Sequence, residues 1–290
     1  MKKIVFVSDF FIQDGIGGAE LTTDAIMRYG ASKTNTFEIG AIHTTKLDTK
    51  IIDANKDNSY FIVCNFKGLS NESKIHMCKN ASYSIVEYDY KVCEYRSFEL
   101  HEMYENNSCD CETKISGKIT SAFYGYADKI WFMSKKQKDM ILAKVPVIKQ
   151  EKCEVLSSVF SAGDLRFIYS LRENEKDNKY LILDSESPVK GTSECVSYAE
   201  ENNLEYELIS NLPYHELLIK LSTSKGLIFK PVASDTCPRL VIEAKLLNCE
   251  LQLNEHVQHR DEDWFNKPND EIVKYLRTRK DYFWMHAFND

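Results

Sequence analysis

Short β-like runs alternate with helix-like segments along almost the whole chain, and this alternation constrains the fold more than any other feature. Strands separated by segments of helical periodicity pair in parallel, and the intervening helices cover the faces of the sheet. The first series of expected strands is KIVFVSD, FEIGAIH, YFIVCNF, SYSIVEYD and KIWFMS, with expected helices at residues 19–29, 71–78, 118–127 and 135–144. The first half of the chain is therefore expected to form one parallel α/β sheet.

A second series of the same kind begins near Lys179. Its expected strands are KYLILDS, EYELIS, GLIFKP and ELQLN, and its expected helices are residues 192–202, 214–222 and 238–247. The polar segment LRENEKDNK, which separates the two series, is predicted to be a linker. A chain of 290 residues suits two domains, so we predict two doubly wound α/β domains, residues 1–170 and 171–290. The last segment, about residues 270–290, is expected to be an amphipathic helix and is a candidate to pack back on the N-terminal domain.

The composition is that of a soluble globular protein, with 43% apolar and 28% charged residues. The net charge of −7 disfavours nucleic acid or an anionic membrane as a partner. No stretch reaches the roughly 20 apolar residues that a transmembrane segment needs, and Asp9 interrupts the first apolar run too early for a signal peptide. Nine cysteines without an export signal fit a reducing compartment, so a cytoplasmic location is expected.

Parallel sheets bind ligands at the carboxyl ends of their strands, and the segment DGIGGAE follows the first expected strand. Gly17 and Gly18 lead there into a helix that is expected to begin near Ala19. Glycines let the backbone approach a ligand closely, and a helix N-terminus favours an anion or a sugar hydroxyl. The alternative is a plain glycine turn, because a short glycine cluster is a weak motif. The segment also does not match the dinucleotide-binding pattern G-x-G-x-x-G.

The segment DSESPVKGT follows the first strand of the second series and contains Lys190. Gly191 comes next, and Thr192 is a plausible N-cap of the following helix. A cation at a helix N-terminus opposes the helix dipole, so Lys190 is poorly placed for stability but well placed to bind a diphosphate. A solvated loop lysine is the alternative interpretation.

The segment KPVASDTCPRLVIEAKLLNC carries three charged residues into a helix that is otherwise apolar. Arg239 and Glu243 lie four residues apart on one helix face, and Asp235 lies in the loop before the helix. Carboxylates accept hydrogen bonds from a diol, and a guanidinium binds phosphate in a forked geometry. The set therefore suits a ligand with ribose hydroxyls and phosphates. An intrahelical Arg–Glu pair with a capping acid is the alternative.

An acid followed by seven residues and Glu resembles the acid-x7-Glu motif of retaining GT-B glycosyltransferases of family four. GGAE (residues 17–20) is similar to the N-terminal glycine loop of that family, VKG (residues 189–191) to its phosphate-binding lysine, and VLSSVFSAGDL stands where the family has its interdomain strand and turn. The resemblance covers the layout of nearly the full chain. It implies a GT-B fold, in which two Rossmann-like doubly wound domains face each other across a cleft.

The resemblance also implies roles for single residues. Glu243 would bind the ribose of a nucleotide sugar, Lys190 its diphosphate, and Asp235 would face the transferred sugar. The glycine loop with Gly17 and Gly18 would lie over the phosphates and the sugar. With Lys190, Arg239 and a helix N-terminus carrying the phosphate charge, no catalytic metal is expected.

Three positions depart from the family pattern. The first acid of the motif is Asp235 rather than Glu, and Ser185 replaces an arginine, so Arg239 is expected to supply the second positive charge. The active-site histidine of the family has no clear match. EYDY stands in its place, which makes Glu87 and Asp89 candidates to contact the sugar or the acceptor.

The polar segment 93–111 contains three cysteines and one histidine, namely Cys93, His101, Cys109 and Cys111. This ligand set suits a structural tetrahedral zinc ion. The spacing C-x7-H-x7-C-x-C is not a common zinc-finger pattern, so free cysteines in a reducing compartment are the alternative.

The resemblance, taken with these observations, implies a hexosyltransferase that uses a UDP- or GDP-linked sugar, retains the anomeric configuration and acts on a hydroxyl of a glycan, lipid or other acceptor. A non-catalytic relative that binds a nucleotide or a sugar is the first alternative, because of Ser185 and the missing histidine. A nucleotide-sugar epimerase of the same architecture is the second.

Overall fold

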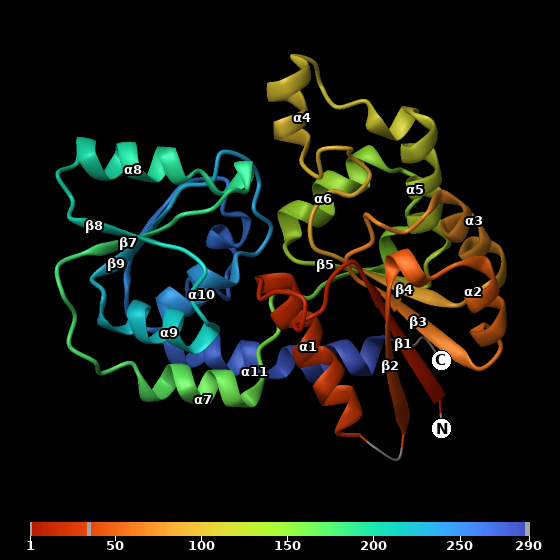
Figure 1. Ribbon diagram of the computed structural model, residues 1–290, viewed down its shortest axis with the longest axis horizontal. Helices are drawn as coiled ribbons and strands as arrows, with labels where there is room; N and C mark the ends of the chain where they lie inside the picture. Colours follow the sequence, from red (N-terminus) through yellow and green to blue (C-terminus); the bar gives the residue numbers. More distant parts are fainter. Residues whose placement is uncertain (1, 34–35, 288–290) are drawn as a thin grey trace. The chain divides into compact units, whose positions relative to one another are not determined.

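The computed structural model describes residues 2–33 and 36–287, and the chain divides into two compact units. Unit 1 contains the chain up to Val159 together with the part from Arg279 onward, and unit 2 contains Phe160–Thr278 (Figure 1). Each unit has its own parallel β-sheet.

Among the described residues, the sheet of unit 1 has six parallel strands in the order β2-β1-β3-β4-β5-β6. The strands are β1 (Lys2–Ser8), β2 (Phe37–His43), β3 (Ser59–Val63), β4 (Tyr83–Glu87), β5 (Lys129–Phe132) and β6 (Cys153–Val155). Every residue of β3, β4 and β5 is buried. Strands covered by helices on both faces carry apolar residues almost continuously, which explains why YFIV, YSIV and IWF lack a polar alternation.

Helices cover both faces of this sheet (Figure 1). They are α1 (Gly18–Ala31), α2 (Thr49–Asn55), α3 (Asn71–Asn80), α4 (Phe98–Glu105), α5 (Ile115–Tyr126) and α6 (Lys135–Lys144), with the 3₁₀ turns η1 (Thr44–Lys46), η2 (Cys111–Thr113) and η3 (Gln150–Lys152). Helices α2, α3 and α5 pack next to one another. Serine side chains at residues 70, 97 and 134 accept backbone hydrogen bonds at the starts of α3, α4 and α6, as N-caps do.

The sheet of unit 2 has four parallel strands in the order β10-β9-β7-β8. They are β7 (Tyr180–Leu183), β8 (Tyr206–Ile209), β9 (Gly226–Phe229) and β10 (Glu250–Leu253). The helices are α7 (Ala162–Ser170), α8 (Thr192–Glu201), α9 (Tyr214–Thr223), α10 (Arg239–Leu246) and α11 (Asn269–His286), with the turns η4 (Pro188–Lys190) and η5 (Gln258–Asp261). Helix α8 covers one face, while α9 and α10 pack together on the other (Figure 1).

The predicted class, two doubly wound α/β units, is confirmed, but the division between the units differs from the expected one. Residues 171–179 do not separate the units, because Asp177 N donates to Thr223 O at 2.7 Å and Arg172 Nε to Leu246 O at 2.9 Å, both within unit 2. The preceding segment is helix α7, with a capping box between Ser161 and Asp164. This helix groups with unit 2, because Asp164 pairs with Arg239 of α10 at 2.8 Å.

The expected C-terminal helix is α11, and residues 288–290 of that prediction lie outside the described residues. The part of α11 from Arg279 groups with unit 1. There Trp284 Nε1 donates to Ile26 O at 3.0 Å, and the ring of Phe283 lies 5.0 Å from that of Trp131. Among the described residues, no helix combines the length and the apolar character that crossing a membrane demands.

Candidate functional site

Two charged side chains meet at the carboxyl edge of the sheet in unit 2. Lys190 follows β7 and Asp235 follows β9, and Lys190 Nζ lies 2.6 Å from Asp235 Oδ2. The lysine side chain is 31% exposed and the aspartate side chain 12%, so the pair remains open to solvent on one side. An ion pair at this edge of a doubly wound sheet lies where such sheets bind their ligands.

The turn that carries Lys190 depends on Gly191. This residue adopts a left-handed conformation with φ 65°, and a Cβ there would collide with the carbonyl oxygen of Lys230. Thr192 Oγ1 donates to Leu183 O at 2.9 Å and accepts from Ser185 N at 3.2 Å, which fixes the loop to the end of β7. Lys190 is thereby held at the N-terminus of α8, where the amide groups of the first turn favour an anion.

The loop that carries Asp235 is anchored to the segment after β10. Asp235 N donates to His256 O at 2.9 Å, and Gln258 N donates to Asp235 O at 3.1 Å. These bonds fix the backbone of Asp235 from both sides. Its carboxylate is left to interact with Lys190 or with a ligand that replaces it.

Arg239 and Glu243 lie on one helix face, as predicted, but they are buried in a closed polar cluster. Arg239 Nε donates to Glu243 Oε1 at 2.8 Å, and both side chains are at most 3% exposed. Another nitrogen of Arg239 contacts Asp164 Oδ2 at 2.8 Å and Tyr214 OH at 2.9 Å, and its guanidinium carbon lies 3.8 Å from the centroid of the Phe160 ring. Tyr214 OH in turn donates to Glu243 Oε1 at 2.7 Å.

This cluster changes the interpretation of the two residues. The buried arginine is neutralised by two carboxylates and joins α7, α9 and α10, so Glu243 and Arg239 would contact a nucleotide only if the cluster opened. Burial raises the pKa of Glu243, although Arg239 and the Tyr214 hydroxyl act to lower it. Removing one partner of a buried pair leaves an uncompensated charge, which makes this cluster a structural element of unit 2.

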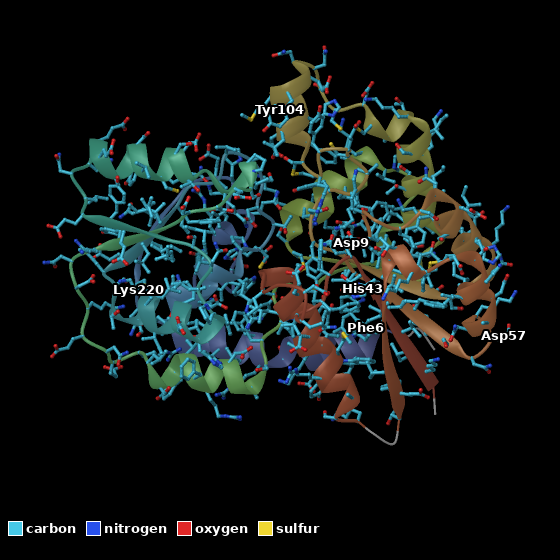
Figure 2. All side chains as sticks on the ribbon, viewed as in Figure 1. Phe6, Asp9, His43, Asp57, Tyr104 and Lys220 are labelled. Atoms are coloured by element: carbon cyan, nitrogen blue, oxygen red, sulfur yellow. The ribbon has the colours of Figure 1, made fainter. Side chains whose placement is uncertain are left out.

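Several polar side chains converge at the carboxyl edge of the sheet in unit 1. The carboxylate of Asp9, after β1, accepts from Lys67 N and Gly68 N at 2.8 Å and from Thr44 Oγ1 at 2.6 Å. Asp9 and His43 are close together at this edge in Figure 2, and His43 Nδ1 lies 3.3 Å from Asp9 O. Asp9 thus ties the ends of β1, β2 and β3 to one another.

His43 was missed by the sequence analysis. It is the last residue of β2, and its Nε2 lies 3.7 Å from Asp14 Oδ2 in the loop before α1. The signal was present, because FEIGAIH places a histidine at the carboxyl end of an expected strand. A half-buried histidine beside the glycine loop is a candidate to contact a ligand.

The glycine loop leads into α1 as predicted, with Gly17 as the N-cap in extended conformation and Gly18 as the first helical residue. The carboxylate of Glu20 lies against Gly17, and a Cβ on Gly17 would collide with it. Burial raises the pKa of Glu20, and Arg96 and Lys91 oppose this shift. The absence of a side chain at Gly17 therefore leaves room for the Glu20 carboxylate.

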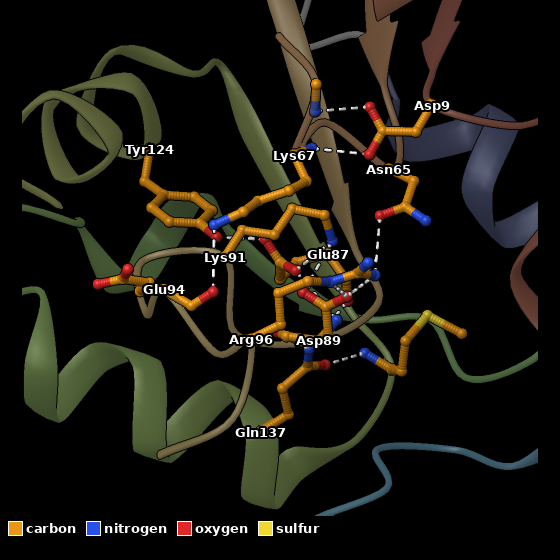
Figure 3. Close-up of polar contacts among 12 residues, drawn as sticks. Asp9, Asn65, Lys67, Glu87, Asp89, Lys91, Glu94, Arg96, Tyr124 and Gln137 are labelled. Carbon is orange, nitrogen blue, oxygen red and sulfur yellow. Dashed lines mark hydrogen bonds and ion pairs between the residues drawn. The ribbon is translucent and has the colours of Figure 1, made fainter. Parts of the chain in front are cut away.

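Glu87 and Asp89 lie at the end of β4 in a charged network that Figure 3 shows in full. Glu87 is fully buried; its Oε1 lies 2.9 Å from Lys91 Nζ, and its Oε2 accepts from the Tyr124 hydroxyl. Asp89 contacts Lys91 Nζ at 3.0 Å and Arg96 Nε at 2.8 Å. Both candidate carboxylates are therefore bound by neighbouring side chains, and Glu87 has no surface for a sugar.

The network separates the pKa values of its two acids. Burial raises the pKa of Glu87 to about 7, although Lys91 lowers it. Burial also acts to raise the pKa of Asp89, but Lys91 and Arg96 outweigh it and hold that pKa below the usual value. Asp89 is the more strongly ionised of the two and the more exposed, with a side chain 19% accessible.

A cavity of about 450 Å³ opens in unit 1 beside this network. Lysines 67, 74 and 91 line it, together with the first residues of α3 and the segment 92–94. Lys74 is buried, with Nζ 3.5 Å from Thr120 Oγ1, and burial lowers its pKa to about 8. Within residues 2–33 and 36–287, no carboxylate forms an ion pair with Lys74. Three lysines and one carboxylate, that of Glu94, thus line the cavity, and Lys91 is paired with Glu87 and Asp89.

The four predicted metal ligands are brought together in unit 1. The ligand atoms of Cys93, His101, Cys109 and Cys111 all lie within 4.8 Å of one another, and all four residues are buried. Burial raises the pKa of the Cys93 thiol to about 12 and also raises that of Cys109. Without a cation the Cys93 thiol would stay protonated at neutral pH.

No protein-family model matches the chain, and no curated protein matches it in sequence. Solved structures do match. HepE of Anabaena in complex with UDP and glucose is 12% identical, with 99% of this chain and 92% of that chain covered and a TM-score of 0.58. An α-glucosyltransferase in complex with UDP and a 13-mer DNA is 9% identical, with 99% and 92% covered and a TM-score of 0.55. UDP-GlcNAc 2-epimerase of Methanocaldococcus jannaschii is 10% identical, with 96% and 92% covered and a TM-score of 0.50.

These likenesses extend over nearly the whole of each chain, but at identities of 12% or less they establish the fold alone. They agree with the two parallel sheets and with the helices that cover them. The chain therefore has the GT-B fold that the sequence predicted.

Proposed function

We propose that the protein is a glycosyltransferase whose unit 2 binds a nucleoside-diphosphate sugar, most simply a UDP-sugar. The observation that carries this proposal is the Lys190–Asp235 ion pair at the N-terminus of α8, at the carboxyl edge of the sheet. Structures of the same fold have been solved with UDP or UDP-glucose bound. A partly exposed lysine at a helix N-terminus supplies the charge that a diphosphate requires.

The ion pair suggests how donor binding and chemistry are linked. An incoming diphosphate competes with Asp235 for Lys190, and the displaced carboxylate then accepts hydrogen bonds from hydroxyl groups of the sugar. During transfer the bond from the anomeric carbon to the diphosphate breaks, and Lys190 with the amide groups of α8 stabilises the negative charge on the leaving group. The acceptor oxygen forms the new bond to the anomeric carbon, and its proton passes to solvent or to a basic group.

Two finer points, transfer of a hexose and retention of the anomeric configuration, rest on the resemblance of the segment from Asp235 to Glu243 to the acid-x7-Glu motif of retaining GT-B glycosyltransferases. In this proposal Arg239 and Glu243 act as positioning residues, because they are buried and hold α10 against α7 and α9. A contact between Glu243 and ribose would need the Tyr214 hydroxyl to move away.

The acceptor is proposed to be a hydroxyl compound bound by unit 1, such as a glycan or a lipid. Asp89 and His43 are the candidate contacts, since both are partly exposed at the carboxyl edge of the sheet. Buried Glu87 would position Lys91 and Asp89, because its carboxylate binds Lys91 Nζ and accepts a hydrogen bond from the backbone N–H of Asp89. One solved neighbour is an α-glucosyltransferase in complex with UDP-glucose and DNA, so an acceptor screen should include DNA, although a net charge of −7 disfavours it here.

Thermal unfolding with UDP, GDP and ADP tests the donor site. A nucleotide at about 100 times its dissociation constant should add about 2.7 kcal/mol to the free energy of unfolding. We expect UDP to stabilise the wild type and Lys190→Ala to lose most of this effect. Lys225→Ala is the matched control, because Lys225 is a partly exposed lysine of unit 2 that pairs with Glu250 at 3.9 Å. Equal stabilisation of wild type and Lys190→Ala by UDP would contradict the proposed site.

An epimerase is the second candidate, because a UDP-GlcNAc 2-epimerase has the same fold. Incubation with UDP-sugars, followed by NMR of the products, separates the candidates. A transferase should yield UDP and a glycosylated acceptor, and an epimerase should yield a 2-epimer without any acceptor. A non-catalytic binding protein should be stabilised by UDP but leave every UDP-sugar unchanged.

A further inference from the structure

Three cysteines and a histidine from different segments converge at one buried point of unit 1. Cys93 lies in the loop after β4, His101 on α4, and Cys109 and Cys111 on the segment before α5. Eighteen positions separate the first ligand from the last, yet all four ligand atoms lie within 4.8 Å of one another. Each of the four residues is at most 3% exposed.

The separations approach those that a single tetrahedral ion requires. With Zn–S near 2.3 Å and Zn–N near 2.0 Å, tetrahedral geometry places sulfur and nitrogen ligands about 3.5 Å apart and two sulfurs about 3.8 Å apart. His101 Nδ1 lies 3.5 Å from Cys111 Sγ and 3.9 Å from Cys93 Sγ. The four atoms are thus close enough to share one ion and too close to surround a multi-iron cluster.

The surroundings of Cys111 and His101 favour a bound cation. Glu94 N lies 3.5 Å from Cys111 Sγ and donates toward it, as backbone amides do to a charged sulfur. His101 Nε2, the nitrogen away from the sulfurs, lies 4.0 Å from Asp110 Oδ1. Metal-bound histidines characteristically direct their second nitrogen toward a carboxylate or a carbonyl group.

The fold of this segment also needs a cross-link. Helix α4 has eight residues, of which Phe98, Leu100 and His101 are buried, while Met103 and Tyr104 are more than half exposed. So short a helix is marginal without tertiary contacts, and these few apolar contacts offer little to hold it. An ion bound by His101 and the three cysteines would link α4 to the loop after β4 and to the segment before α5.

We propose that Cys93, His101, Cys109 and Cys111 bind one zinc ion, which fixes the segment from residue 93 to residue 111 on unit 1. Three thiolates and one imidazole are a common ligand set of structural zinc, and four protein ligands leave no position for a substrate. The site is therefore structural. It also anchors the loop that carries Lys91 and Arg96, the two cations of the Glu87–Asp89 network. This inference does not depend on the proposed glycosyl transfer.

Metal analysis of the purified full-length protein tests the site. We expect about one zinc per chain in the wild type. After replacement of zinc by Co²⁺, we expect thiolate-to-cobalt charge-transfer absorption and the intense d–d bands of a tetrahedral site. His101→Ala and Cys111→Ser should lower the zinc content to near zero. Cys153→Ser and His76→Ala are the matched controls and should keep the full content, because both residues belong to unit 1 and lie outside the cluster.

The wild-type measurements keep the proposal testable even if the cluster variants fail to fold. A folded wild type that contains no zinc and shows no cobalt charge-transfer bands would overturn it. A disulfide among Cys93, Cys109 and Cys111 found by mass spectrometry in that protein would overturn it too, as would folded variants that retain their zinc.

Discussion

At the scale of single residues, the same kind of charged side chain has different roles according to its burial. Lys190 is paired with Asp235 but partly exposed, so a ligand can replace its partner. Arg239 is buried among Glu243, Asp164 and Tyr214, where a rearrangement would leave charges unpaired. Exposure, more than residue type, separates the candidate binding residues from those that hold the unit together.

Lys74 is a third case, a buried ammonium group with a hydroxyl as its hydrogen-bond partner. Its pKa is about 8 in the folded protein and near 10.4 in an unfolded chain. Between these pH values the unfolded state binds more protons at this side chain, so the contribution of Lys74 to the free energy of unfolding becomes less unfavourable as the pH increases from 8 to 10. Below pH 8 Lys74 is protonated in both the folded and the unfolded state, so the cost of burying its charge lowers the free energy of unfolding by the whole amount.

We therefore expect Lys74→Met to raise the free energy of unfolding at pH 7, by at most about 3 kcal/mol, and the gain to shrink toward pH 10. Urea denaturation at several pH values measures this difference. Lys67→Met is the control, because Lys67 is an exposed lysine of the same cavity, and it should change stability by less than about 0.5 kcal/mol. A gain that does not vary with pH would contradict the assignment to the buried charge.

At the scale of elements, the start of α8 determines the geometry of the candidate donor site. Gly191 turns the chain from η4 into α8 with a positive φ, and the helix then exposes its first amide groups beside Lys190. The carbonyl oxygen of Lys230 occupies the space that a Cβ of residue 191 would need. The turn thus depends on glycine for its dihedral angle and for its packing.

Gly191→Ala should destabilise the protein by about 2 kcal/mol or more and weaken UDP binding, because the loop must shift away from Lys230. Calorimetric titration with UDP and thermal unfolding measure the two effects. Gly163→Ala is the control within α7, since a Cβ there meets only Ser161 Oγ, at 3.5 Å. It should leave UDP binding unchanged and add up to about 1 kcal/mol of stability. Similar losses in both variants would argue against a specific role for the turn.

At the scale of the whole molecule, the end of the chain completes the core of unit 1. Phe283 is fully buried next to Trp131 of β5, and Arg279 donates to the carbonyl groups of Val155 and Leu156 at 3.0 Å. Residues more than a hundred positions apart in the sequence thus share one core. Unit 1 is therefore not made by a continuous piece of chain.

Phe283→Ala should cost about 3–5 kcal/mol, the usual range for removing a buried aromatic ring. The loss should appear in unit 1, where hydrogen exchange of β5 and of α1 would report it. Met285→Ala, two residues along the same helix at a side chain that is 76% exposed, should cost less than about 0.5 kcal/mol. Protection of β5 unchanged in Phe283→Ala would show that unit 1 folds without this helix.

The sequence by itself determined the class of fold, because hydrophobic periodicity and strand-to-helix alternation are local properties that each segment carries alone. It also singled out Lys190, Asp235 and the four proposed cysteine and histidine ligands, since residues at strand ends and clustered soft ligands can be recognised by position and type. The structure has two parallel sheets, as the sequence predicted. It brings Lys190 close to Asp235, and it brings the three cysteines close to the histidine.

Only the tertiary structure decided which charges are open to a ligand and where the units divide. Burial depends on contacts between distant segments, so no local pattern could show that Asp164 and Tyr214 enclose Arg239, or that Lys91 and Tyr124 enclose Glu87. The assignment of α7 to unit 2 and of the end of α11 to unit 1 likewise depends on contacts between segments that are distant in the sequence. Sequence spacing fixes which residues can share an element, whereas packing fixes which of them remain available to a ligand.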